Sequence, residues 1–211
     1  MGNFYTSYTL RGPSQQVVAA ALAGRAAFVT PARNDCVVVF DEKSEEQKLE
    51  MIANLAAGLS RKLDCPVLAV LNHDDDVLWY RLYLSGELAD EYDSSPGYFD
   101  SSAEPSAPAG GDARKLCGTF GADNVGAVAK VLRKSAFDED GYAFAVERHA
   151  DLAHAVGIPS FGVGAGYRYI AEGELPEGLD EHDLIRVTRG SCLSLIRQWW
   201  RRILGQTKRI T

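Results

Sequence analysis

Short apolar runs and helical spacings alternate through the first 93 residues of the chain. Runs rich in aromatic and β-branched residues predict strands at residues 4–10, 26–30, 36–40, 67–71, 77–84 and 87–92. An Ala-rich stretch predicts a helix at residues 17–22. A second helix is predicted from an apolar stripe at i, i+3, i+4 spacing, formed by Leu49, Ile52, Ala53, Ala56 and Leu59. The order of these elements predicts an α+β protein whose N-terminal part is a ferredoxin-like split βαβ antiparallel sheet with two helices on one face.

Polar residues mark the turns between these elements. Ser44 and Gln47 fit the capping-box pattern and are predicted to begin the second helix. The acidic run Asp74-Asp75-Asp76 separates two predicted strands but lacks the spacing of a calcium-binding loop. We therefore interpret it as a solvated hairpin turn.

The composition changes abruptly at residues 94–111, where 14 of the 18 residues are Ser, Pro, Gly or Ala. Such a stretch is typical of a linker or a long surface loop. It divides the chain into a ferredoxin-like α+β subdomain at residues 1–93, a second α+β subdomain at residues 112–190 and a tail at residues 191–211.

The second subdomain has a mixed helical and strand pattern. We expect helices at residues 113–120, 124–134 and 142–156, and strands at residues 161–170 and 184–187.

Three glycines lie inside the strand expected at residues 161–170. Gly162, Gly164 and Gly166 would share one face of that strand and leave a bare strip. Close packing of a neighbouring element is the first interpretation of this strip, and a ligand-binding groove is the second.

Two histidines lie on the helix expected at residues 142–156. His154 shares a face with Glu147 and Asp151, which favours a solvated acidic face but also fits a metal or general-base site. His149 shares its side with apolar residues and is expected to be a structural histidine.

The tail predicts a basic amphipathic C-terminal helix at residues 194–204. Its candidate binding residues are two tryptophans and three arginines, namely Trp199, Trp200, Arg197, Arg201 and Arg202. Tryptophan beside arginine on such a helix is typical of interfacial membrane helices and of helix-in-groove ligands. Three targets stay open: the acidic body of this chain, another protein, or anionic lipid.

Charge is distributed unevenly along the chain. The net charge is −7, yet residues 184–211 contain seven basic residues and no acidic ones, which leaves −14 on residues 1–183. An acidic body argues against nucleic acid as a partner, because duplex affinity depends on neutralising phosphates.

No apolar run is long enough for a transmembrane segment.

The location of the protein is interpreted from its first residues and its cysteines. We expect no secretory signal, and the four widely spaced cysteines are expected to be reduced thiols, so we expect a cytoplasmic protein. The first six residues also match the short N-myristoylation pattern, although they overlap the first predicted strand.

These patterns favour a non-enzymatic protein–protein interaction module, an acidic binder of the inhibitor or immunity type, with no cofactor and no metal. One alternative is a peripheral membrane protein attached through the Trp-bearing helix. The other is an enzyme of unknown reaction with a site near residues 162–166 and the helix of His149 and His154. A fold of this class hosts many functions and therefore does not choose among them.

We predict that limited proteolysis cuts first within residues 94–111, because this composition buries too little apolar area to offset backbone ordering. Mass spectrometry of the first fragments locates the cut. Initial cleavage within residues 44–63 or 142–156 would contradict the proposed boundary.

Overall fold

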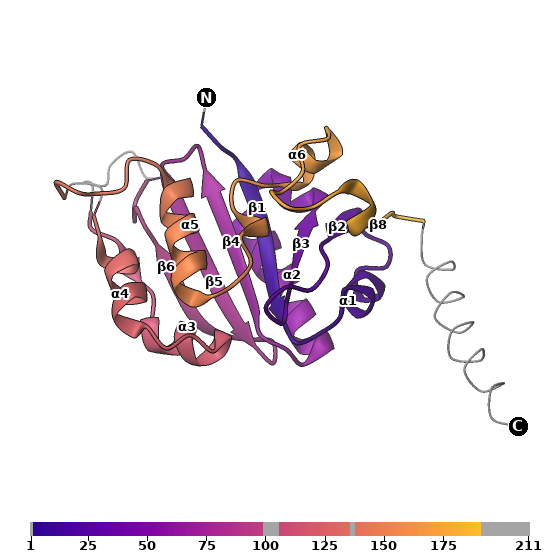
Figure 1. Cartoon of the computed structure of the whole chain (residues 1–211), viewed down its shortest axis with the longest axis horizontal. Helices are drawn as coiled ribbons and strands as arrows, with labels where there is room; N and C mark the ends of the chain where they lie inside the picture. The colour runs from indigo at the N-terminus through magenta and orange to yellow at the C-terminus, as the bar shows by residue number, and fades with distance from the viewer. Residues whose placement is uncertain (1, 99–105, 136–137, 191–211) are drawn as a thin grey trace, which may run out of the picture.

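Strands from both parts of the chain form one continuous sheet. The structure, a computed structural model, describes residues 2–98, 106–135 and 138–190. Within these residues the chain forms an eight-stranded antiparallel sheet with the order β7-β6-β5-β4-β1-β3-β2-β8 (Figure 1). The strands are β1 (Tyr5–Arg11), β2 (Ala27–Val29), β3 (Cys36–Asp41), β4 (Val67–His73), β5 (Val77–Leu84), β6 (Glu87–Asp93), β7 (Ala109–Gly110) and β8 (Ile185–Val187).

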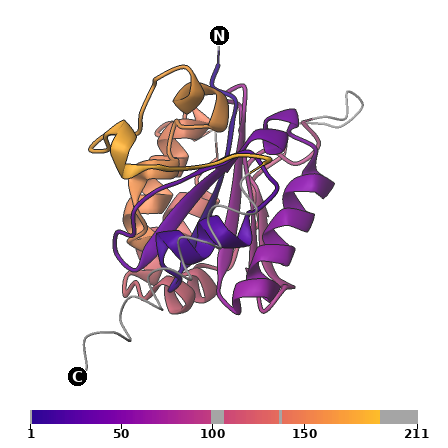
Figure 2. The ribbon, with the colours of Figure 1, turned by 90° about the vertical axis from the view of Figure 1, so that its right-hand side faces the viewer.

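Helices cover both faces of this sheet. The α-helices are α1 (Gln15–Ala21), α2 (Leu49–Leu63), α3 (Ala113–Phe120), α4 (Val125–Arg133), α5 (Ala145–Val156) and α6 (Tyr167–Ala171), and the 3₁₀-helices are η1 (Glu42–Glu46), η2 (Ser160–Gly162) and η3 (Glu181–Asp183). Figure 2 shows α2 on one side of the sheet and α3 to α5 on the other. The α+β class predicted from the sequence is confirmed.

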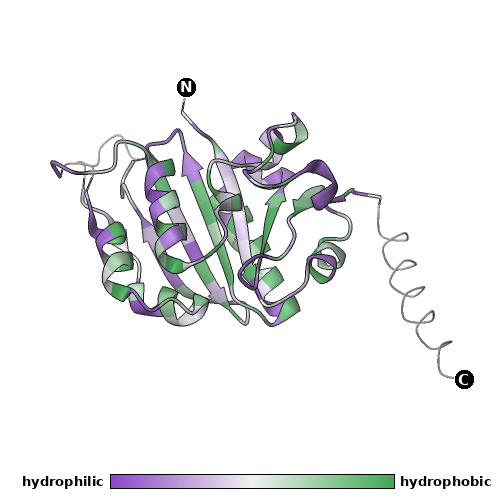
Figure 3. Cartoon of the chain, viewed as in Figure 1, coloured by the Kyte–Doolittle hydropathy of each residue, from purple (hydrophilic) through white to green (hydrophobic). Residues whose placement is uncertain are grey.

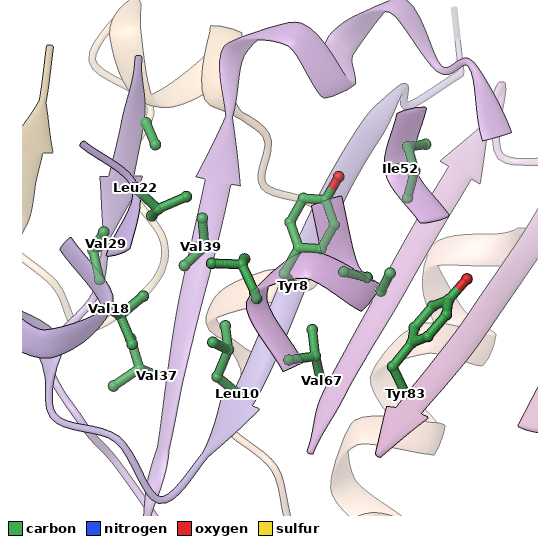
Figure 4. Close-up of a cluster of buried hydrophobic side chains, with 14 of the residues drawn as sticks. Tyr8, Leu10, Val18, Leu22, Val29, Val37, Val39, Ile52, Val67 and Tyr83 are labelled. Carbon is green, nitrogen blue, oxygen red and sulfur yellow. The ribbon is translucent and has the colours of Figure 1, made fainter. Parts of the chain in front are cut away.

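Alternation along the central strands explains the two layers of helices. On β4, Val67, Ala69 and Leu71 pack in one core with α1 and α2, whereas Leu68 and Val70 pack in a second core with α3 to α5. Successive residues of a strand point to opposite faces, so a nearly continuous apolar run supplies both cores. Figure 4 shows the first core, where Tyr8, Leu10 and Val39 project from the sheet toward Ile52 and Val18.

Hydropathy follows this layering. Strands β3 and β4 are mostly hydrophobic, β1 between them is of intermediate hydropathy, and the outward side of α5 is mostly hydrophilic (Figure 3). The stripe predicted on α2 is buried at Ile52, Ala53, Ala56 and Leu59, while Leu49 is exposed at the first turn.

The predicted capping box at Ser44 and Gln47 is wrong. Helix α2 begins at Leu49 after Lys48, and Gln47 adopts a left-handed conformation with φ of 52°. Ser44 lies in η1, where its backbone N–H and its hydroxyl both donate to the Asp41 carboxylate. The buried Asp41 side chain is itself held by two charged hydrogen bonds from Arg25, each 2.7 Å long. Ser44 therefore belongs to a buried ion-pair network and not to the start of α2.

The strand predicted at residues 161–170 is also wrong. This segment forms the short helix η2, a bend and the helix α6. The aromatic and glycine-rich pattern was interpreted as extended, but the left-handed φ of 67° at Gly164 turns the chain between the two helices.

The predicted linker contributes to the sheet at one end. Strand β7 pairs with β6 through Asp93 with Ala109 and Tyr92 with Gly110. Strand β8, from the second predicted subdomain, pairs with β2 at the other edge of the sheet. The division at residues 94–111 stays a prediction.

The basic helix predicted at residues 194–204 lies outside the described residues.

In the described part of the chain, no helix combines the length and the apolar character needed to cross a bilayer.

Candidate functional site

A small polar cavity opens at the end of the sheet where β4 turns into β5. Its volume is about 110 Å³. Its walls come from the β4–β5 turn, the residues after β6 and the start of α5 with the loop before it, and Ser106 and Ser135 complete them. The side chains that matter most are Asp75, Asp76, Ser94, Phe144 and Arg148. We call this feature the Arg148 cavity.

Arg148 contributes a buried positive charge to this cavity. Its side chain comes from α5 and the residue is 3% exposed. Its Nη1 donates to the Tyr92 hydroxyl and to the Val131 carbonyl, both at 2.9 Å. Its guanidinium carbon lies 4.5 Å from the centre of the Tyr142 ring. Burial raises the pKa of Tyr92 to about 12, although the positive charge of Arg148 acts in the opposite direction.

The acidic turn positions the start of α5 beside the cavity. Asp75 is 9% exposed, and its carboxylate accepts hydrogen bonds from the side-chain amides of Asn72 and Asn3. Its carbonyl accepts a 2.6 Å hydrogen bond from the backbone N–H of Ala145. The prediction of a fully solvated turn is therefore wrong for Asp75, because this residue joins the N-terminus, β4 and α5. Asp74 and Asp76 are exposed, as expected.

Two exposed aromatic side chains flank the cavity. Phe144 is 54% exposed immediately before α5, and Tyr98 is 41% exposed. The Tyr98 hydroxyl donates to the Asp76 carboxylate at 2.8 Å. Large apolar side chains on a surface beside a cavity are typical of contact with another molecule.

His149 forms a buried pair with Tyr5 on the opposite side of α5 from the acidic residues. The Tyr5 hydroxyl lies 2.9 Å from Nδ1 of His149, and the two rings are stacked. Burial lowers the pKa of His149 from 6.5 to about 4 and raises that of Tyr5. His149 is therefore neutral near pH 7, and its burial agrees with its interpretation as a structural histidine.

The acidic face predicted on α5 is solvated. Glu147, Asp151 and His154 are all exposed. Asp151 accepts a hydrogen bond from the Tyr142 hydroxyl, and Glu147 accepts one from the backbone N–H of Phe144. These bonds hold the loop before α5, which forms part of the cavity wall.

The three candidate glycines do not share one face. An added Cβ at Gly162 would lie 2.7 Å from the Ser7 hydroxyl, and one at Gly166 would lie 3.0 Å from the Glu45 carboxylate. The Glu45 carboxylate accepts the backbone N–H of Tyr167 at the start of α6. Gly162 and Gly166 therefore allow close packing on β1 and η1, which agrees with the first interpretation of these residues. The bare strip itself does not exist.

The other candidate site residues lie outside the described residues. These are Trp199, Trp200, Arg197, Arg201 and Arg202.

One group of ligand-type side chains is brought together near the C-terminal end of the described residues. Asp180, His182 and Asp183 have ligand atoms within 4.8 Å of one another. Asp180 and His182 are exposed, and Asp183 already accepts the backbone N–H of Asp180. This arrangement is explained by the capping of η3.

Sequence reasoning missed the Arg148 cavity because its walls come from five separate segments. The available signal was weak: an arginine at the position next to His149, on the side of α5 that the apolar pattern predicts to be buried. A buried arginine needs partners, and their identity depends on tertiary packing.

The comparisons with known proteins give no relative: no family model, no curated protein and no solved structure matches the chain. The cavity geometry therefore carries the functional argument.

Replacing Gly164 with Val is expected to lower the free energy of unfolding by about 1–3 kcal/mol, because a β-branched residue is strained at the positive φ of this position. Gly58→Ala is the matched control. Gly58 lies inside α2 with open space around it, so this variant should gain about 0.5–1 kcal/mol from helix propensity. Urea unfolding measures both values. A Gly164→Val protein as stable as the wild type would show that the turn adopts another conformation.

The stability of the protein should fall as the pH decreases from about 6.5 toward 4, in part because of His149. In this window the unfolded chain binds a proton at His149, whereas the folded protein, with a pKa of about 4, does not. Above pH 6.5 the imidazole is neutral in both states and contributes no such dependence. In the His149→Phe variant, urea unfolding at successive pH values should therefore show a smaller loss. Identical slopes in the two proteins would mean that the folded-state pKa is not lowered.

Proposed function

We propose that the protein is a non-enzymatic protein–protein interaction module, an acidic binder of the inhibitor or immunity type. Its binding surface is the sheet end around the Arg148 cavity. The observation that carries this proposal is the exposure of two aromatic residues at one cavity: Phe144, 54% exposed, lines it, and Tyr98, 41% exposed, donates a hydrogen bond to Asp76 of its wall. Aromatic residues that already lie on a rigid scaffold contact a partner at little entropic cost.

The charge around this surface indicates the character of the partner. Exposed carboxylates lie in the β4–β5 turn and in the loop before α5, at Asp74, Asp76, Asp138, Glu139 and Asp140. Among the neighbouring cations, Lys134 is paired with Asp140 and Arg148 is buried. A partner segment with lysine or arginine residues would complement this rim and would associate faster at low salt.

We also propose that the N-terminal part has the ferredoxin-like split βαβ topology. Three facts support this assignment: the local strand order β4-β1-β3-β2, the antiparallel pairing of these strands, and the packing of α1 and α2 in one core. The assignment concerns the scaffold and does not identify the partner.

A cytoplasmic location is part of the same proposal. It is supported by Cys36, Cys65 and Cys117, which are buried and free. Burial raises the pKa of Cys36 and Cys65 to about 11, so these thiols resist oxidation. Cys192 lies outside the described residues.

Capture of a partner by the immobilised full-length protein should depend on Phe144. Phe144→Ser is expected to weaken capture at least about tenfold, which is the usual loss when a buried aromatic anchor is removed. Val17→Ser is the matched control, because Val17 is also an exposed apolar residue, at 46%, but lies on α1. Quantitative mass spectrometry of the captured proteins measures the ratio.

Deletion of residues 191–211 distinguishes binding at the Phe144 surface from binding by the tail. A captured protein that depends on Phe144 but not on the tail or on Val17 supports the proposal. A captured protein that is lost only when the tail is deleted would assign binding to the tail instead.

A further inference from the structure

The buried positive charge of Arg148 has no carboxylate partner among the residues that the structure describes. The residue is 3% exposed, yet no carboxylate in residues 2–98, 106–135 or 138–190 forms an ion pair with it. Its polar partners are a tyrosine hydroxyl and a carbonyl, and both are held by Nη1. Removing a positive charge from water is costly unless a negative charge compensates for it.

Two donors of Arg148, Nε and Nη2, have no acceptor among the described residues. The described residues accept no hydrogen bond from Nε or Nη2, and no buried side-chain nitrogen or oxygen of this part of the chain lacks a partner. Because they have no partner, Nε and Nη2 are not fully buried. The open space next to them is the cavity that Arg148 lines. These two groups form one edge of the planar guanidinium, and this edge donates two parallel hydrogen bonds to a single anion.

Two further features supply positive potential or a donor at the same place. Phe144 and Ala145, at the start of the 12-residue helix α5, line the cavity, so the positive end of the helix dipole lies there. Ser94 also lines the cavity and is 9% exposed. Its Oγ accepts the backbone N–H of Leu78 at 2.8 Å, and its own proton has no acceptor among the described residues.

We infer that the Arg148 cavity is a binding site for a carboxylate group. The carboxylate would lie between the Nε–Nη2 edge of Arg148 and the Ser94 hydroxyl, near the start of α5. This inference goes beyond the proposed interaction surface, because it names the chemical group that binds, whether a small molecule or a polypeptide carries it.

The charge of the walls selects a carboxylate over a phosphate. Asp75 and Asp76 also line the cavity. The Asp75 oxygens are occupied by Asn72 and Asn3, but the exposed Asp76 carboxylate repels any anion that enters. Repulsion rises with the charge of the ligand, so a monoanion is tolerated where a dianion is not. A planar group with two oxygens also matches the guanidinium edge.

Titration of the full-length protein with sodium acetate tests this site. The probe is the Nε–H resonance of Arg148 in a ¹H–¹⁵N spectrum, assigned by its loss in Arg148→Lys. Acetate should shift this resonance saturably with a Kd in the millimolar range, whereas acetamide, the neutral analogue, should not. Inorganic phosphate should bind more weakly than acetate. The absence of a saturable shift up to about 50 mM acetate, or an equal shift with acetamide, would overturn the inference.

Asp76→Asn gives a test that does not depend on removing a buried residue. Loss of the negative charge at the cavity mouth should strengthen acetate binding about two- to fivefold. If acetate bound more weakly to Asp76→Asn than to the wild type, the Asp76 charge would not be repelling the ligand. That result would refute the carboxylate assignment.

A basic tripeptide, lysyl-lysyl-alanine, identifies the source of the carboxylate. Tighter binding of the free-acid peptide than of acetate, abolished by C-terminal amidation, supports a polypeptide carboxylate. Equal binding of the free-acid peptide and acetate supports a small-molecule carboxylate. Equal binding of the free-acid and amidated peptides would overturn the site. All of these measurements use purified protein, so their failure leaves the Phe144-dependent capture of a partner untouched.

Discussion

Burial of both faces of the central strands is the constraint on which the rest of this structure depends. An antiparallel sheet commonly has one face in water, but β1, β3, β4 and β5 are covered on both. Each large apolar side chain that is fully buried contributes about 1.5–3 kcal/mol, so covering the second face adds substantially to stability. The residues that follow the Ser/Pro/Gly/Ala-rich stretch provide this second layer through α3, α4 and α5. The two parts of the chain therefore share one sheet.

Polar residues in the central strands show the consequence of this two-sided burial. Tyr5 and Tyr8 are both fully buried on β1, but their hydroxyls point to opposite layers. Tyr5 meets His149 of α5, and Tyr8 meets Ser44 of η1. A buried hydroxyl without a partner would destabilise the fold, so each tyrosine fixes the position of one residue in the layer that it faces.

The candidate site lies where this layered arrangement ends. The β4–β5 turn emerges from the sheet directly beside the start of α5, and Asp75 joins the two. Arg148 sits one turn further into the helix, between the sheet residue Tyr92 and the helix residue Val131. The cavity thus combines a rigid floor with an exposed aromatic rim. The proposed interaction surface and the proposed carboxylate site both rest on this combination, together with the guanidinium edge that has no acceptor among the described residues.

The sequence by itself determined the elements whose signal is local. Period-2 apolar runs, helical stripes and turn residues located β1 to β6, β8 and α1 to α5, because side-chain alternation and capping act over a few residues. Tertiary structure decided what depends on residues far apart in the chain. Ser44 formed a buried hydrogen bond with Tyr8 of β1 instead of capping α2, and residues 161–170 folded around Tyr5 and Glu45 instead of forming a strand. Asp75 became buried, and Arg148 has no carboxylate partner in the part of the chain that the structure describes, for the same reason. The free energy of a buried polar group depends on all the partners that packing brings to it, and some of them lie far away in the sequence, such as Tyr8 for Ser44 and Asn3 for Asp75.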